Sequence, residues 1–167
     1  TGKVQWYQAL WDDLVLYTGA QFGYLGYYNK DIGYSPFEGF VLGGDGMSGY
    51  NVYGRETIGL RGYVNESLTA GYSSNIYEMF TTEIRYPLTL QPQAAIYLLG
   101  FLEAGNSWYE FNSFKPFNIH RSAGVGVRLF LPMIGMLGVD WGYGFDKVLG
   151  NDDAHKGHFH FQIGMPF

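Results

Sequence analysis

Few side chains in this sequence have the type and spacing for covalent or metal chemistry. The 167 residues contain no cysteine, so disulfides and thiolate metal sites are excluded. His155, His158 and His160 are close in sequence, but we expect His155 in a loop and the other two at the start of the last strand, and we predict no metal site. We find no Gly-x-Ser-x-Gly elbow, no Ser-His pair of the lipase type and no nucleotide motif. The sequence therefore predicts neither an enzyme nor a cofactor.

The charged residues are few and mostly acidic. There are 15 acidic against 10 basic residues, a formal net charge of −5, and no stripe of lysine and arginine that could neutralise phosphates. We therefore predict no nucleic-acid partner. Asp45, Asp152 and Asp153 lie in loops with glycine or asparagine, but they lack the Asp-x-Asp-x-Asp-Gly spacing of a calcium loop, and we interpret them as solvated surface acids.

The apolar residues are distributed as in β-strands. The chain is 47% hydrophobic and 19% aromatic, yet its mean hydropathy is only −0.09, because apolar residues alternate with small and polar ones. No stretch approaches the roughly 18 consecutive apolar residues of a transmembrane helix. A membrane protein with this sequence would have to be a β-barrel, the other structure that satisfies its backbone groups in lipid.

Period-two alternation is clearest in the last ten residues, where Phe159, Phe161, Ile163 and Phe167 share one parity while polar residues or glycine occupy most of the other. The same pattern recurs upstream. It predicts six whole strands and one partial strand, at 3–9, 14–28, 79–88, 94–108, 122–131, 137–145 and 158–167.

The polar face of these strands favours a membrane barrel over a soluble sandwich. A soluble sandwich also alternates, but its outer face is rich in lysine and glutamate. Here the polar face is mostly glycine with isolated charges, which suits a crowded or wet lumen, and the large aliphatic and aromatic side chains suit lipid.

The connections between the predicted strands are alternately short and long. The long ones cover about 29–76, 109–119 and 146–157, and the others span only a few residues. Outer-membrane barrels have tight periplasmic turns at one end and extended loops at the other. We therefore predict an all-β fold, the C-terminal portion of a transmembrane antiparallel β-barrel. Such barrels need at least eight strands, and the sequence starts without Met or signal peptide, so we expect the remaining strands to come from residues upstream or from another chain.

Two motifs in the longest connection carry a family resemblance. Pro36-Phe37-Glu38-Gly39-Phe40-Val41-Leu42-Gly43-Gly44 is followed by Leu60-Arg61-Gly62-Tyr63. Together they resemble the sixth extracellular loop of the BamA-like outer-membrane protein assembly factors, whose hallmark is a hydrophobic-Arg-Gly-aromatic tetrad. The resemblance continues through Glu83, Glu103 and the last strands. The chain departs from the commonest family pattern in Tyr63 for Phe, Glu103 for Asp and a longer spacer before Arg61.

The resemblance implies a sixteen-stranded barrel in the bacterial outer membrane, preceded by periplasmic POTRA domains. It places the loop 29–76 inside the lumen and Glu83 and Glu103 on the lumen wall. An arginine carried into a lumen loses solvation unless it meets carboxylates. We therefore predict that Arg61 pairs with Glu83, Glu103 or both, which would hold the loop inside the barrel.

By resemblance, the function is folding and insertion of nascent outer-membrane proteins, with accessory lipoproteins and the lipid bilayer as further partners. The closing strand suggests the route. Pro166 cannot donate a ladder hydrogen bond and Gly164 weakens the strand, so we predict a weak lateral seam formed by Phe159, Phe161, Ile163, Gly164, Pro166 and Phe167. Two alternatives stay open: a TamA-like factor or two-partner-secretion transporter, which share the tetrad, and a passive outer-membrane channel.

Overall fold

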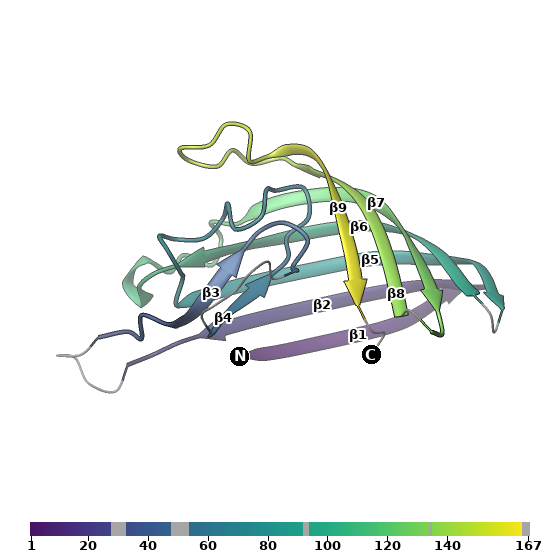
Figure 1. Ribbon diagram of the computed structural model, residues 1–167, viewed down its shortest axis with the longest axis horizontal. Helices are drawn as coiled ribbons and strands as arrows, with labels where there is room; N and C mark the ends of the chain where they lie inside the picture. Colours follow the sequence, from purple (N-terminus) through teal and green to yellow (C-terminus); the bar gives the residue numbers. More distant parts are fainter. Residues whose placement is uncertain (28–32, 48–53, 92–93, 134, 165–167) are drawn as a thin grey trace.

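The fold is a single curved antiparallel sheet with a long connection folded against its concave face (Figure 1). The computed structural model describes residues 1–27, 33–47, 54–91, 94–133 and 135–164. Seven strands form the sheet in the order β1-β2-β5-β6-β7-β8-β9. Their bounds are β1 Gly2–Trp11, β2 Leu14–Tyr24, β5 Ile76–Gln91, β6 Ala94–Trp108, β7 His120–Leu131, β8 Gly135–Gly144 and β9 Lys156–Gly164. The predicted all-β antiparallel architecture is confirmed.

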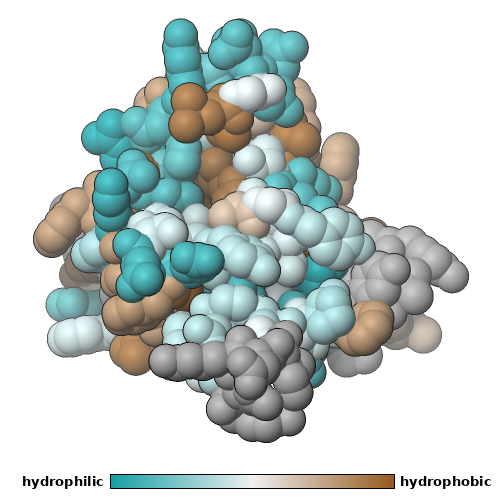
Figure 2. All heavy atoms as spheres, turned by 90° about the vertical axis from the view of Figure 1, so that its left-hand side faces the viewer, coloured by the Kyte–Doolittle hydropathy of each residue, from teal (hydrophilic) through white to brown (hydrophobic). Residues whose placement is uncertain are grey.

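The long connections gather at one end of the sheet and the short turns at the other (Figure 1). Residues 25–75 join β2 to β5, residues 109–119 join β6 to β7 with a short 3-10 helix η1 (Phe111–Ser113), and residues 145–155 join β8 to β9. Figure 2 looks at the end with the long connections and shows a largely hydrophilic surface with a few apolar groups. Within the described residues, no helix is long and apolar enough to cross a membrane.

The alternation seen in the sequence separates the two faces of the sheet. The outer, convex face carries large exposed apolar side chains from every strand, including Ile84, Leu102, Val125, Trp141 and Phe161. The inner, concave face carries the buried polar and charged side chains, among them Glu83, Glu103, Arg128, Asp140 and His160. This is the reverse of a soluble sandwich and the arrangement expected for strands with lipid outside.

The longest connection contains two strands that the sequence reading missed. β3 (Glu38–Leu42) and β4 (Gly54–Ile58) pair in parallel as a separate two-stranded sheet. This small sheet packs on the inner face through an apolar cluster of Phe40, Leu42, Ile58, Leu60, Tyr63, Leu68, Tyr77 and Met79. The cluster draws its last two members from β5, so it fastens the connection to the sheet wall.

Several strand bounds differ from those predicted. β2 ends at Tyr24 and not at residue 28, because its ladder partner β5 begins at Ile76, directly opposite Tyr24. The first strand is longer than the predicted 3–9, since β1 pairs with β2 from Gly2 to Trp11. The closing strand starts two residues earlier than predicted, at Lys156, where its ladder with β8 begins opposite Gly144. Its predicted end at 165–167 lies outside the described residues.

Candidate functional site: the loop tip and its ion pairs

Two glycines turn the long connection toward the sheet. Gly43 and Gly44 have φ values of +121° and +83°, and their N–H groups donate to the carbonyls of Ile58 and Leu60. A Cβ on Gly44 would overlap the Asn65 side chain, so only glycine fits. The turn aligns the segment after β4 so that fully buried Leu60 faces the apolar cluster. Leu60 and the three residues after it, Leu60–Tyr63, are called the loop tip below.

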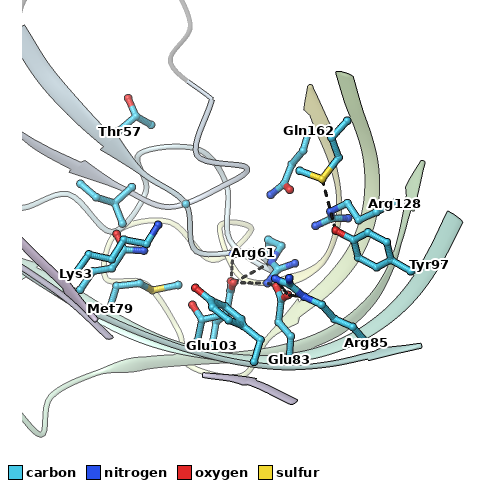
Figure 3. A pocket seen from close by; sticks show the side chains of 16 residues that line it. Lys3, Thr57, Arg61, Met79, Glu83, Arg85, Tyr97, Glu103, Arg128 and Gln162 are labelled. Atoms are coloured by element: carbon cyan, nitrogen blue, oxygen red, sulfur yellow. Dashed lines mark hydrogen bonds and ion pairs between the residues drawn. The ribbon is translucent and has the colours of Figure 1, made fainter. Parts of the chain in front are cut away.

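Arg61 projects from the loop tip onto the sheet wall (Figure 3). Its Nε and Nη2 donate to Oε1 of Glu103 on β6 at 2.9 and 2.5 Å. Its backbone N–H donates to Oε2 of the same carboxylate at 2.7 Å. Nη2 also reaches Oε1 of Glu83 on β5 at 2.6 Å, and Nη1 reaches Oδ2 of Asp140 on β8 at 3.2 Å. One guanidinium therefore contacts carboxylates from three strands.

Two further arginines balance these carboxylates. Arg85 donates to the free oxygen of Glu83, with Nε at 2.8 Å. Arg128 donates to both oxygens of Asp140, at 2.6 and 2.7 Å. The network, defined here as Arg61, Arg85, Arg128, Glu83, Glu103 and Asp140, thus holds three positive and three negative charges and is formally neutral.

The centre of the network is buried. Arg61 is 4% exposed, and its guanidinium carbon lies 3.7 Å from the centre of the Phe101 ring. Burial by itself would lower the pKa of Arg61, but the adjacent Glu103 carboxylate, followed by Glu83 and Asp140, outweighs burial and raises it, so the guanidinium stays charged. A buried pair of this kind is strongly destabilised when one partner is removed, because the other is left without compensation.

Gly62 lies against the backbone of β8. Its φ is +90°, and a Cβ there would lie within 3 Å of the backbone of Tyr143 and Gly144. β8 also has a glycine at the point of contact: a Cβ on Gly142 would lie 2.6 Å from the Gly62 nitrogen. The Gly62 N–H donates to Nε2 of His160 on β9 at 2.9 Å. Glycine at this position therefore permits both the backbone conformation and the close approach.

Tyr63 ties the loop tip to the end of the sheet where the long connections lie. Its ring is fully buried, and its hydroxyl donates to the carbonyl of Arg121 at 2.8 Å and accepts from the N–H of Asp146 at 3.2 Å. Burial raises the pKa of Tyr63 to about 12, so the phenol remains a donor at neutral pH. A phenylalanine could fill the same space but could not make these two bonds.

A polar pocket of about 340 Å³ lies beside the network on the inner face (Figure 3). Its lining includes Arg61, Arg85, Arg128, Glu83 and Glu103, together with Gln162 of the closing strand. Among the described residues there is no group of three or more His, Cys, Asp or Glu side chains that could hold a metal ion. The carboxylates that approach one another here are engaged by arginines.

The structure brings together the residues that the sequence reading paired and adds others. Arg61 contacts both Glu83 and Glu103. Asp140, Arg128 and His160 were not assigned a role from sequence. The signal for Asp140 was visible, since it is the one charged residue on the glycine-rich parity of its strand. Its partner could not be read from sequence, because 79 residues separate it from Arg61.

The predicted seam residues lie on β9, one of the two edges of the sheet in the described chain. Phe159, Phe161 and Ile163 point outward and are exposed. Gly164 is the last residue of β9 and pairs with Met136 of β8. The remaining two, Pro166 and Phe167, lie outside the described residues.

Comparison with protein families agrees with this geometry. The model of the Omp85 superfamily domain matches residues 1–167, the whole chain. The chain belongs to the Omp85 superfamily. Neither the curated proteins nor the solved structures contain a significant match. Omp85 proteins are outer-membrane β-barrels that insert or transport proteins without covalent catalysis. The open seven-stranded sheet is accordingly part of an Omp85 barrel, and its concave face is the lumen side.

Proposed function

We propose that this Omp85 chain is the C-terminal part of a BamA-like assembly factor that folds and inserts nascent β-barrel proteins into the bacterial outer membrane. The observation that carries the proposal is the docked loop tip. The tetrad Leu60–Tyr63 contacts β5, β6, β8 and β9 at once through ion pairs and hydrogen bonds. A loop held this way braces the wall next to the closing strand and occupies the lumen.

The closing strand supplies the proposed route for substrates. β9 pairs with β8 and lies at one edge of the described sheet, so its other edge is the side that would form the seam with the first strand of the complete barrel and would open to a substrate strand. A nascent strand can add to such an edge by main-chain hydrogen bonds. Phe159, Phe161 and Ile163 would face lipid during the exchange, while Gly164 and Pro166 keep the seam with the first barrel strand weak and Phe167 ends it.

The partners follow from this route. The substrates are unfolded outer-membrane proteins with alternating strands, and the lipid bilayer is the second partner, contacted by the apolar outer face. The POTRA domains expected upstream of the barrel would lie on the periplasmic side. Accessory lipoproteins would bind the assembly complex from the same side. We propose no cofactor, metal or nucleic acid.

Two other functions make different predictions. A TamA-like factor or a two-partner-secretion transporter would keep the docked tetrad, and the number of upstream POTRA domains separates these from a BamA-like factor. A passive channel requires an open lumen. The buried network and the apolar cluster of the loop fill space on the lumen side, which favours low conductance in single-channel recordings.

The proposal is tested by reconstituting the full-length protein in lipid vesicles and measuring the folding of an unfolded outer-membrane protein against empty vesicles. We expect faster folding with the reconstituted protein, and equal rates would refute the assembly function. For the seam, a photo-crosslinking residue at Phe161 should capture the substrate. The matched control is Val127, which is also exposed on the outer face but lies on the interior strand β7. Equal capture at both positions would contradict the seam.

A substitution at Pro166 tests whether this residue weakens the seam. Pro166→Ala restores a backbone donor at the closing strand, so it should strengthen pairing with the first barrel strand and slow insertion. Unchanged insertion together with unchanged hydrogen bonding at the seam would overturn the role given to Pro166.

A further inference from the structure

The loop tip contacts the closing strand through a buried hydrogen bond that involves no ion pair. The Gly62 N–H donates to Nε2 of His160 at 2.9 Å, and the His160 ring is almost fully buried on the inner face of β9. A backbone amide can only donate, so Nε2 must accept and carry no proton. The bond therefore exists only while the imidazole is neutral.

This bond matters because β9 lies at one edge of the described sheet, on the side of the proposed seam. One ladder, with β8, holds it to the described sheet. The loop approaches β9 at one other polar point, where the Gln162 amide donates to the Asp45 carbonyl at 3.4 Å, a much longer bond. The Gly62–His160 bond is the shorter and more buried of the two, and it joins the closing strand directly to the residue that follows Arg61.

Among the described residues, the two acids that act on the His160 ring, Asp140 and Asp45, already accept hydrogen bonds from other groups. Asp140 on β8 lies opposite His160 in the ladder, but its carboxylate already accepts three hydrogen bonds from Arg61 and Arg128. The cationic Arg61 lies on the loop tip, and the ring centre of His158, on the same strand, lies 6.3 Å from that of His160. Asp45, in the segment after β3, is the remaining acid that acts on the ring.

We propose that His160 is a positioning residue that docks the closing strand onto the loop tip, and that protonation of its ring releases the strand. An imidazolium has two N–H donors, so it would present N–H to N–H at Gly62 and add a charge to a neutral network. The inference rests on the proposed function, because a docked β9 is a closed side of the seam. The loop and the seam then act as one unit, and acidification frees the strand that pairs with substrate.

The test uses the full-length protein in lipid bilayers, with spin labels on cysteines placed at Ile163 of β9 and Ile84 of β5. Both side chains are exposed on the outer face and four strands apart, about 20 Å at about 4.8 Å per strand. The described chain contains no native cysteine, so labelling here is specific. The acidic arm of the test is taken down to pH 5 because burial disfavours the charged form of an imidazole.

We expect a narrow distance distribution at pH 8, and at pH 5 a broadening with a shift of about one strand spacing, about 5 Å. His160→Gln keeps an acceptor that does not titrate, so it should stay narrow at both pH values. His160→Leu should be broad at both. The control His158→Gln should respond to pH like the unsubstituted protein, because His158 contacts the His155 carbonyl and not the loop tip.

Several results would overturn the inference: no pH response in the unsubstituted protein, a retained response in His160→Gln, a narrow distribution in His160→Leu, or loss of the response in His158→Gln. The distances are read without substrate. A failure of the docking model is therefore distinguishable from a failure of the assembly function, which the insertion assay measures on the unsubstituted protein.

Discussion

Replacing Glu103 by glutamine tests whether the ion pairs hold the loop tip on the wall. Glu103 accepts three hydrogen bonds from Arg61, and within the described chain it meets no other arginine. Glu83 and Asp140 each have a second arginine, Arg85 and Arg128. Glu103→Gln therefore removes the charge on which Arg61 depends most, and it replaces one of the two accepting oxygens by an NH2 group that cannot accept a hydrogen bond from Arg61.

The expected cost follows from the burial of the pair. Removing one partner of a buried ion pair costs about 3–5 kcal/mol. We take about 3 kcal/mol, because Glu83 and Asp140 still contact the guanidinium. At about 1.4 kcal/mol per factor of ten, the undocked population of the loop tip rises about 100-fold. The sheet keeps its ladders, so the change is local opening and not unfolding of the barrel.

Hydrogen exchange of the full-length protein in bilayers measures this opening. The amides of Arg61, Gly62 and Val64 are bonded to Glu103, His160 and Ala154, so all three exchange only when the tip opens. Protection of the peptide that contains them should fall about 100-fold, while peptides from β6 and β7 stay unchanged.

Glu78→Gln is the matched control for this measurement. Glu78 is a similarly buried carboxylate on β5, but its parity is that of outward-facing Phe80 and Ile84, away from the loop tip, and it has no ion pair among the described contacts. It should leave the exchange of the loop tip as it is. If Glu103→Gln matches the unsubstituted protein, or if Glu78→Gln lowers protection as much, the ion pair is not what docks the loop.

Three further substitutions probe neighbouring contacts. Gly62→Ala forces a Cβ into the backbone of β8 at a φ of +90°, so it should undock the tip at least as strongly as Glu103→Gln, and protection within a few-fold of normal would contradict the fit described for Gly62. Tyr63→Phe removes the bonds to Arg121 and Asp146 and should lower the docking stability by about 1 kcal/mol, again read by exchange; no change would show that shape alone positions the ring. Phe161→Arg should destabilise the folded barrel in bilayers by up to about 2–4 kcal/mol in denaturant titrations, and a neutral result would argue against lipid contact on that face.

Much of the sheet could be predicted because its cause is local. A strand between lipid and a lumen must alternate, so each strand carries its own signal, and the alternation of 122–131 and 137–145 located β7 and β8 to within two residues. Strand ends were less certain, as at Tyr24, because the end of a strand depends on where its partner stops. β3 and β4 were missed since their parallel pairing joins two short segments across a long spacer.

The sequence by itself determined the fold class, the faces of the strands and the tetrad that marks the loop, because alternation and motif lie within short stretches of chain. Only the tertiary structure decided which groups meet Arg61. Its carboxylate partners lie 22, 42 and 79 residues away, and the register of the three strand pairs from β5 to β8 brings them to one point. The register of β8 with β9 places His160 beside Gly62, 98 residues apart. A hydrogen bond between such distant residues depends on the folded sheet, so no local pattern could have revealed it.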